Sequence, residues 1–229
     1  MFISEIGINH NGSLAIAKDL ILMAKECGAD VVKFQKRNPA MCVPQEQMSI
    51  IRDTPWGKMT YLDYKKKIEF KKEDYDEIDR FCKEKGIKWT VSVWDIDSAK
   101  FIFENYDVPF IKIASACITD IKLLEYIRDN YNGHVIFSTG MSTIEEIKEA
   151  AKIFDYNNIT VMLCNSSYPS VDEELDLRAL ELLKQELNIG EENMSRLGYS
   201  GHEKDILPTI MAKTLGAEVI ERHITLDKG

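Results

Sequence analysis

The chain has 229 residues, 45% of them hydrophobic, which is enough to bury the core of one α/β domain. Its 38 acidic residues outnumber its 29 basic residues and give a net charge of -9, which argues against a surface that binds nucleic acid or an anionic membrane. The five cysteines form no CxxC pair, and no apolar run reaches the roughly 18 residues needed to cross a bilayer. We therefore expect a cytoplasmic protein with free thiols.

Apolar runs of strand length alternate with segments of helical periodicity, a pattern typical of a parallel sheet wound with helices. We expect strands near residues 2–7, 30–35, 88–93, 110–113, 134–138, 159–164, 194–200 and 218–223. Helices are expected at residues 14–27, 72–85, 96–105, 121–130, 144–154, 176–187 and 205–215. This pattern predicts an α/β fold, a (β/α)8 TIM barrel with the eighth helix missing because the chain stops at Gly229. The outer wall left bare by that helix should be apolar, and either a partner chain covers it or it promotes aggregation.

The connection between the second strand and the second helix is unusually long, at roughly 36 residues. A connection of this length is usually functional, often a lid or an oligomer contact. Within it the segment TPWGKMTYLDYKKKIEF combines aromatic residues with Lys65, Lys66 and Lys67. A solvated helix face is favoured over a substrate role for these three lysines.

In a barrel of this class the functional residues lie at the carboxyl ends of the strands. The first strand carries Glu5 near its end, and the second carries Lys33 and Gln35, which alternation places on one face. The fourth strand contains Lys112, with Ser115 just beyond it. A lysine inside an apolar strand is costly unless it is paired, so both lysines are candidate functional groups.

The fifth and sixth strands end in polar residues, Ser138 in FSTGMST and Asn165 and Ser166 in LCNSSYP. Together with the two lysines, these groups predict a cradle for phosphate or carboxylate. His10 is as consistent with a capping role in its turn as with a substrate contact. His134 lies at the amino end of its strand and is expected to be structural.

Two histidines follow the last two strands, His202 in GYSGHE and His223 in ERHIT, one strand–helix repeat apart. A lone histidine is usually structural, but two at neighbouring strand ends favour a metal site. Imidazole ligands with open positions suit manganese, iron or zinc better than magnesium or calcium.

The motifs EIGINHNGS, VVKFQKR, TPWGKMTYLDYKKKIEF, KIASAC, FSTGMST, SSYP, GYSGHE and ERHITLDKG, in this order, resemble the sialic acid synthase family. That family makes N-acetylneuraminate and related nonulosonates such as legionaminate. The resemblance runs from Phe2 to Gly229. It implies a (β/α)8 barrel that condenses phosphoenolpyruvate with a six-carbon N-acetylamino sugar, N-acetylmannosamine or a diacetamido analogue, and releases phosphate. It also implies a divalent metal, typically manganese, and a dimer in which a C-terminal antifreeze-like domain of one chain caps the barrel of the other.

The resemblance also assigns roles to residues of this chain. The catalytic residues would be Glu5, Lys112 and His202, and the metal ligands His202 and His223. The substrate-binding residues would be Lys33, Gln35, Ser115, Ser138, Ser166, Tyr168 and Ser200. The metal would polarise the aldehyde of the open-chain sugar, and Glu5 would position or deprotonate the water that completes the reaction.

The chain departs from the family pattern in two places. Cys117 stands where some members carry a glutamate that contacts the sugar, and the antifreeze-like domain is absent after residue 229. Residues 1–229 are therefore expected to be the catalytic barrel of a homodimer, or to associate with a chain that supplies the cap. The alternative is a catalytically impaired remnant that binds metal and phosphoenolpyruvate. A third, weaker interpretation is a metal-dependent aldolase or sugar isomerase, with Lys112 as a Schiff-base lysine.

Overall fold

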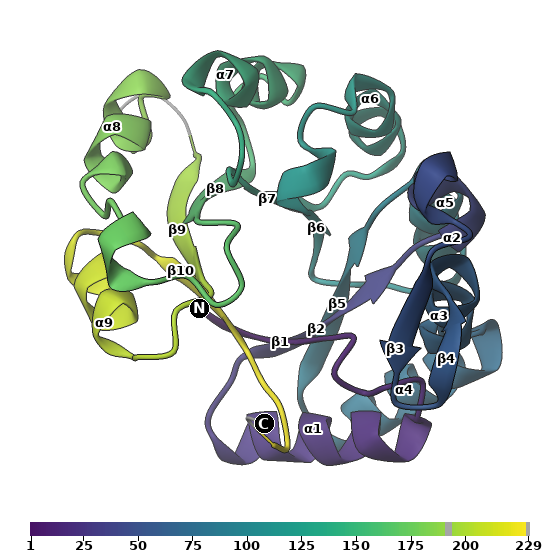
Figure 1. The fold of residues 1–229 in the computed structure, drawn as a ribbon. Helices are drawn as coiled ribbons and strands as arrows, with labels where there is room; N and C mark the ends of the chain where they lie inside the picture. The colour runs from purple at the N-terminus through teal and green to yellow at the C-terminus, as the bar shows by residue number, and fades with distance from the viewer. Residues whose placement is uncertain (191–193, 228–229) are drawn as a thin grey trace.

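Eight parallel strands close into a barrel in the computed structural model, which describes residues 1–190 and 194–227 (Figure 1). The barrel strands are β1 (Phe2–Gly7), β2 (Val31–Lys36), β5 (Lys88–Val93), β6 (Phe110–Ile113), β7 (His134–Ser138), β8 (Ile159–Cys164), β9 (Arg196–Gly201) and β10 (Val219–His223). Around the barrel they follow the order β1-β10-β9-β8-β7-β6-β5-β2, and β2 pairs back onto β1. The predicted TIM-barrel class is confirmed, and the observed strands match the predicted ranges to within two residues.

Within residues 1–190 and 194–227, seven helices cover the outside of the barrel, at the positions that the periodicity predicts (Figure 1). They are α1 (Leu14–Glu26), α4 (Lys72–Lys85), α5 (Ile96–Asn105), α6 (Ile121–Asn130), α7 (Ile144–Ile153), α8 (Ala179–Glu186) and α9 (Leu207–Thr214). Polar side chains begin several of them: Ser13 accepts a hydrogen bond from the Ile16 amide, and Asp95 accepts one from the Ser98 amide. Residues 224–227, which follow β10, contain no helix.

The long connection between β2 and α4, residues 37–71, is folded and is not an irregular loop; we call it the excursion. It contains α2 (Pro39–Cys42), a short 3-10 turn (Gln45–Gln47), the antiparallel hairpin of β3 (Ile51–Thr54) and β4 (Gly57–Thr60), and α3 (Tyr61–Ile68). Gly57 has a φ of +93°, a backbone conformation that favours glycine in a tight turn. The hydroxyl of Thr60 then caps α3 by accepting a hydrogen bond from the Asp63 amide. Glu69, at the end of α3, forms an ion pair with Arg37, which fixes the excursion beside the end of β2.

The interior of the barrel changes from apolar to polar along the strands. The apolar layer near the amino ends consists of Ile3, Val31, Phe110, Ile136, Met162 and Val219. Two residues further along the same strands lie Glu5, Lys33, Lys112, Ser138, Cys164 and Glu221. Since strand side chains alternate between faces, residues two apart point to the same side, here into the barrel. The fold therefore places a ring of polar side chains directly above a layer of apolar side chains.

The main hydrophobic core fills the space between the barrel and the helices. It joins strand residues such as Phe34 and Phe137 to helix residues such as Leu20, Ile78 and Leu124, all of them fully buried. Among the residues that the structure describes, no helix combines the length and apolar character required to span a membrane.

Candidate active site

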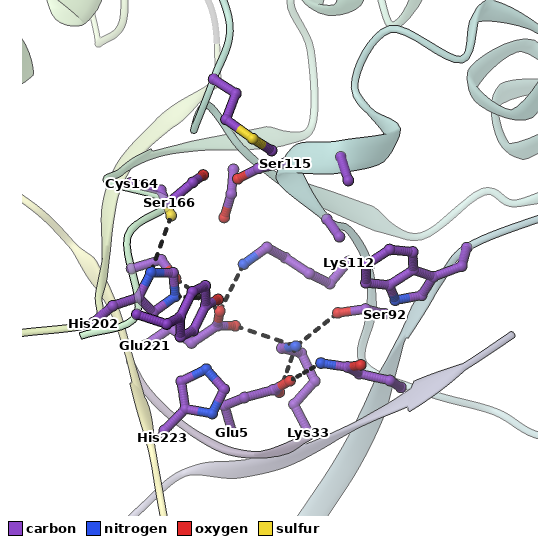
Figure 2. A pocket seen from close by; sticks show the side chains of 18 residues that line it. Glu5, Lys33, Ser92, Lys112, Ser115, Cys164, Ser166, His202, Glu221 and His223 are labelled. Carbon is purple, nitrogen blue, oxygen red and sulfur yellow. Dashed lines mark hydrogen bonds and ion pairs between the residues drawn. The ribbon is translucent and has the colours of Figure 1, made fainter. Parts of the chain in front are cut away.

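A pocket lies at the carboxyl ends of the barrel strands, and the residues of the polar ring line it (Figure 2). The residues to which the family resemblance assigns roles all line it: Glu5, Lys33, Gln35, Lys112, Ser115, Ser138, Ser166, Tyr168, Ser200, His202 and His223. The pocket also contains Ser92, Trp94 and Glu221, which the sequence patterns did not single out. Residues from distant parts of the chain thus meet in one place, as the strand-end argument requires.

Two lysines and two glutamates form a buried ion-pair network on the floor of this pocket (Figure 2). Lys33 Nζ lies 2.5 Å from Glu5 Oε2 and donates a hydrogen bond to Ser92 Oγ at 2.7 Å. Lys112 Nζ lies 2.8 Å from Glu221 Oε1, which also accepts a hydrogen bond from Ser200 Oγ at 2.9 Å. Glu221 Oε2 is 3.6 Å from Lys33 Nζ, so Glu221 bridges the two lysines. Each lysine is only 2% exposed, and two positive charges face two negative ones.

The two carboxyl groups of this network have opposite pKa shifts. Burial raises the pKa of Glu5 above its ordinary value, and this effect exceeds the lowering by Lys33. Burial also acts to raise the pKa of Glu221, but Lys112 and Lys33 together hold it well below its ordinary range. Burial alone would lower the pKa of Lys33, yet Glu221 and Glu5 raise it. Glu221 is therefore a fixed counter-ion, whereas Glu5 is the carboxyl group suited to exchanging a proton.

Serine hydroxyls form the wall above Lys112. The Gly140 amide donates a hydrogen bond to Ser115 Oγ at 3.1 Å. A Cβ at residue 140 would lie 2.1 Å from Ser166 Oγ and 2.9 Å from Ser115 Oγ, so glycine allows these two hydroxyls to converge. Ser138 Oγ is buried and has no hydrogen-bond partner within residues 1–190 and 194–227. A buried hydroxyl without a partner is costly, which makes Ser138 available to an oxygen atom of a ligand.

His202 and His223 lie together on the other side of the pocket, with their ring centroids 5.5 Å apart. His202 Nδ1 is 2.6 Å from the carbonyl oxygen of Asn165 and must donate the hydrogen, because a carbonyl only accepts. His202 Nε2 then carries a lone pair, which accepts a hydrogen bond from the Tyr168 hydroxyl at 2.7 Å. The Tyr168 ring stacks on His202 at a centroid distance of 3.8 Å.

The imidazole nitrogens of His202 and His223 are of the kind that binds a divalent metal ion. Burial lowers the pKa of both imidazoles to about 4, so both are neutral at pH 7, as metal ligands must be. The bond from His202 Nδ1 to a carbonyl is the kind of outer contact that orients a ligating imidazole. No cluster of three or more His, Cys, Asp or Glu side chains suited to a metal occurs in the described part of the chain. A bound ion would therefore have few protein ligands and several positions open to water or substrate.

Three other candidate residues lie outside the pocket lining. His10 is buried, stacks on Phe70 at 4.0 Å and accepts a hydrogen bond from the Gly12 amide, so it organises its turn. His134 contacts Asn158 and Thr160 at the amino end of β7, as expected for a structural histidine. The Asn165 side chain binds the backbone of its own loop, and only its carbonyl reaches the site, through His202.

Comparison with known proteins gives consistent matches over almost the whole chain. The NeuB family profile matches residues 20–229. Human N-acetylneuraminate-9-phosphate synthase is 38% identical over 231 residues, which cover 99% of this chain and 62% of the human protein. The N,N'-diacetyllegionaminic acid synthase of Campylobacter jejuni is 33% identical, over 100% of this chain and 68% of that enzyme.

A solved structure agrees with these matches. The N-acetylneuraminic acid synthetase of Leptospira borgpetersenii, crystallised in complex with citrate, superposes with a TM-score of 0.86 at 29% identity and covers 99% of this chain and 73% of that one. The present chain spans about 62% of the length of the human and mouse relatives.

Proposed function

The chain belongs to the NeuB family, the family of sialic acid synthases, and on that premise we propose that it is a nonulosonate synthase. The proposed reaction condenses phosphoenolpyruvate with an N-acetylamino hexose and releases inorganic phosphate. One observation carries the proposal: a buried lysine pair lined by hydroxyls and a neutral histidine pair face the same pocket. The first pair suits the anionic reactant, and the second suits the carbonyl reactant. The relatives named above are synthases of sialic and legionaminic acids, and none of them supports the alternative of an impaired remnant.

The anionic groups of phosphoenolpyruvate would bind at the lysine end of the pocket. Lys33 and Lys112 supply charged donors, and Ser138 supplies a hydroxyl without a partner among the described residues. Ser115, Ser166 and Ser200 add hydroxyls along the wall. Because Glu5 and Glu221 already balance both lysines, an incoming anion must compete with these carboxylates for the same donors.

In the proposed reaction, C3 of phosphoenolpyruvate attacks the aldehyde carbon of the open-chain sugar, and the aldehyde oxygen takes up a proton. Water then adds to the cationic C2 and loses a proton. Breakage of the bond between C2 and the phosphate oxygen, with loss of the proton on the new hydroxyl, yields the ketone and inorganic phosphate. Glu5, with its raised pKa and its position beside Lys33, would take the proton from the water.

His202 and His223 would hold a divalent metal ion, and the family resemblance favours manganese. When bound, such an ion polarises the aldehyde oxygen as a Lewis acid. The neutral state of both imidazoles and the contact from His202 to Asn165 favour this role. Tyr168, which stacks on His202, and Gln35, which donates to Glu5 Oε1 at 3.1 Å, would orient the sugar above the floor.

The proposed activity is tested by incubating the protein with phosphoenolpyruvate, N-acetylmannosamine and manganese. We expect phosphate and a nine-carbon acid in equal amounts, measured by a phosphate assay and mass spectrometry. The Lys112→Ala variant should bind phosphoenolpyruvate about ten- to a hundredfold more weakly, because it loses a charge-assisted hydrogen bond of about 1.5–3 kcal/mol. The Lys66→Ala variant removes an exposed lysine and should bind normally. Equal losses in both variants would contradict the assigned anion site.

The metal site gives a second prediction, with a readout independent of turnover. His223→Ala should weaken manganese binding by at least about a hundredfold, because it removes one of two imidazole ligands. Titration calorimetry with manganese measures the change. His134→Ala is the matched control, since His134 lies at the opposite end of the barrel and should leave the affinity unaltered. Unchanged affinity in His223→Ala would refute the assignment.

A further inference from the structure

A buried ion pair lies next to the histidine pair, on the helix side of the barrel wall. Glu203 follows His202, and Arg222 precedes His223. Since side chains alternate along a strand, Glu203 and Arg222 point away from the pocket that the two histidines line. The Glu203 side chain is 1% exposed and that of Arg222 is 18% exposed. Apolar side chains of similar volume often stabilise a fold as well as a buried ion pair does, so this pair, which we call the clamp, requires a further explanation.

The clamp connects the loop after β9 to strand β10 and to helix α9. Glu203 Oε2 accepts a hydrogen bond from the Tyr199 hydroxyl at 3.0 Å, and Glu203 Oε1 accepts one from the Thr209 hydroxyl at 3.0 Å. The Arg222 guanidinium donates a hydrogen bond to Thr209 Oγ1 at 2.6 Å. It also donates to two backbone carbonyl oxygens, that of Glu203 and, at 3.1 Å, that of Asp205. A single side chain on β10 therefore binds the backbone of the loop that follows β9.

The clamp lies where the pairing of the two strands ends. The parallel register of β9 with β10 stops at Gly201 and Arg222 and does not extend to the two histidines. A Cβ at residue 201 would lie 2.7 Å from both carboxylate oxygens of Glu203, so glycine lets this carboxylate approach the end of the strand. Beyond that point Arg222 joins the two backbones. It is the residue before His223, and it binds the carbonyl oxygen of the residue after His202.

The two histidines differ in how their rings are held (Figure 2). The His202 ring donates a hydrogen bond to the Asn165 carbonyl, and the His202 carbonyl accepts one from the Ser170 amide at 3.3 Å. The His223 ring makes no hydrogen bond to any residue in the described ranges, and its ring contacts there are with Tyr168 at 5.7 Å and His202 at 5.5 Å. The position of the His223 ring therefore depends on its backbone, which the clamp anchors.

We propose, building on the proposed function, that Glu203 and Arg222 are positioning residues for the divalent metal ion. They contact neither the ion nor the substrate. They hold the backbones of His202 and His223 at a spacing that allows both imidazoles to bind one ion. Such a site depends strongly on this spacing, because the described residues offer no larger cluster of metal-binding side chains that could compensate when one ring moves away.

Titration calorimetry with manganese tests this role. Arg222→Met should weaken manganese binding about ten- to a hundredfold, the loss expected when a contact that orients a metal ligand is removed. Binding of phosphoenolpyruvate, measured without metal, should weaken by less than about threefold, because the clamp does not contact the two lysines. Ile102→Ala is the control for lost stability, since Ile102 is fully buried on α5, which follows β5, the strand opposite β9 in the barrel order. It should lower the midpoint of urea unfolding and leave manganese affinity unchanged.

A second pair of variants tests the clamp from helix α9. Thr209→Val has nearly the same shape but lacks the hydroxyl that lies between Arg222 and Glu203. It should weaken manganese binding about three- to tenfold, the equivalent of one hydrogen bond. Thr209→Ser keeps the hydroxyl and should bind manganese as the unaltered protein does. This pair decides the question if Arg222→Met does not fold.

The outcomes separate the proposals. Normal manganese affinity in Arg222→Met and Thr209→Val would overturn the positioning role and leave the metal site in place. Equal losses of manganese affinity in Arg222→Met and Ile102→Ala, or equal losses of manganese and phosphoenolpyruvate affinity in Arg222→Met, would show that the clamp supports only the fold, and the inference would be wrong. If the unaltered protein binds no manganese, the metal assignment and the inference both fail. Manganese binding without condensation would count against the proposed function, and the comparison of variants would still decide the inference.

Discussion

Replacing Glu221 with alanine is expected to lower the free energy of unfolding by about 3–5 kcal/mol. Glu221 is the carboxylate that bridges Lys33 and Lys112, at 3.6 Å and 2.8 Å, and both lysines are buried. Without it, Lys112 has no carboxylate partner among the described residues and Lys33 keeps only Glu5. Unfolding in urea, followed by circular dichroism, measures the shift in the midpoint.

Glu218→Ala is the matched control, since Glu218 immediately precedes the same strand and its side chain is exposed. That substitution should change the free energy of unfolding by no more than about 0.5 kcal/mol. Replacing Lys112 with methionine in the Glu221→Ala background should recover part of the lost free energy of unfolding. The replacement removes the buried positive charge that the absence of Glu221 leaves without a counter-ion. A loss below about 1 kcal/mol in Glu221→Ala would show that the network contributes little and that its lysines do not require this counter-ion.

The position of Glu221 also shows where the sequence argument stopped short. The sequence indicates that the buried Lys33 and Lys112 need partners, and it places His223 at a strand end. Alternation places Lys33 and Gln35 on one face of their strand, and in the same way it places Val219, Glu221 and His223 on one face of the last strand. Applied to the last strand, it would have placed a carboxylate inside the barrel. The identity of its partner could not be predicted in this way, because the pairing of Glu221 with Lys112 depends on barrel closure across 109 residues of sequence.

The barrel itself could be predicted because each strand is an apolar run bounded by helix signals. The β3–β4 hairpin could not, because its strands are short and largely exposed, so burial imposes no alternation on them. Its determinants are local, namely the turn at Gly57 and the cap at Thr60. The partial burial of Lys65 could not be predicted for the same reason. Lys65 resembles its solvated neighbours in sequence, and only the folded excursion half-buries it beside Arg37.

The histidine site was predictable in its ligands but not in its supporting contacts. His202 is oriented by the carbonyl of Asn165, and a backbone group has no signature in the sequence. The sequence predicts the Asn165 amide as part of the anion cradle, whereas in the structure this amide binds the backbone of its own loop. Residue types at strand ends therefore predict which groups meet, whereas the hydrogen bonds that orient them depend on loop geometry.

In the ion-pair network, Glu5 is the carboxyl group able to change its protonation state, so its replacement should have a large effect on kcat. Glu5→Gln is expected to lower kcat by about 10²- to 10⁴-fold, because the amide cannot accept the proton of the attacking water. Affinity for phosphoenolpyruvate should change by less, since Lys33 keeps Ser92 and Glu221 nearby. Initial rates and calorimetric binding of phosphoenolpyruvate, measured on the same preparation, separate the two effects.

The pH dependence of the rate provides the decisive control for Glu5. A base works when deprotonated, so kcat/KM should fall as the pH drops through the apparent pKa of the buried pair, which burial raises above the ordinary 4.5 for Glu5. Unfolding through Glu5 cannot cause this fall. A group whose pKa is raised by folding stabilises the folded state at low pH, and this contribution is lost as the pH rises through the folded pKa. Glu5→Gln should lack the acid limb, whereas Glu26→Gln, an exposed glutamate on α1, should retain it. A Glu5→Gln variant with a normal rate and an unchanged acid limb would assign the proton transfer to another group.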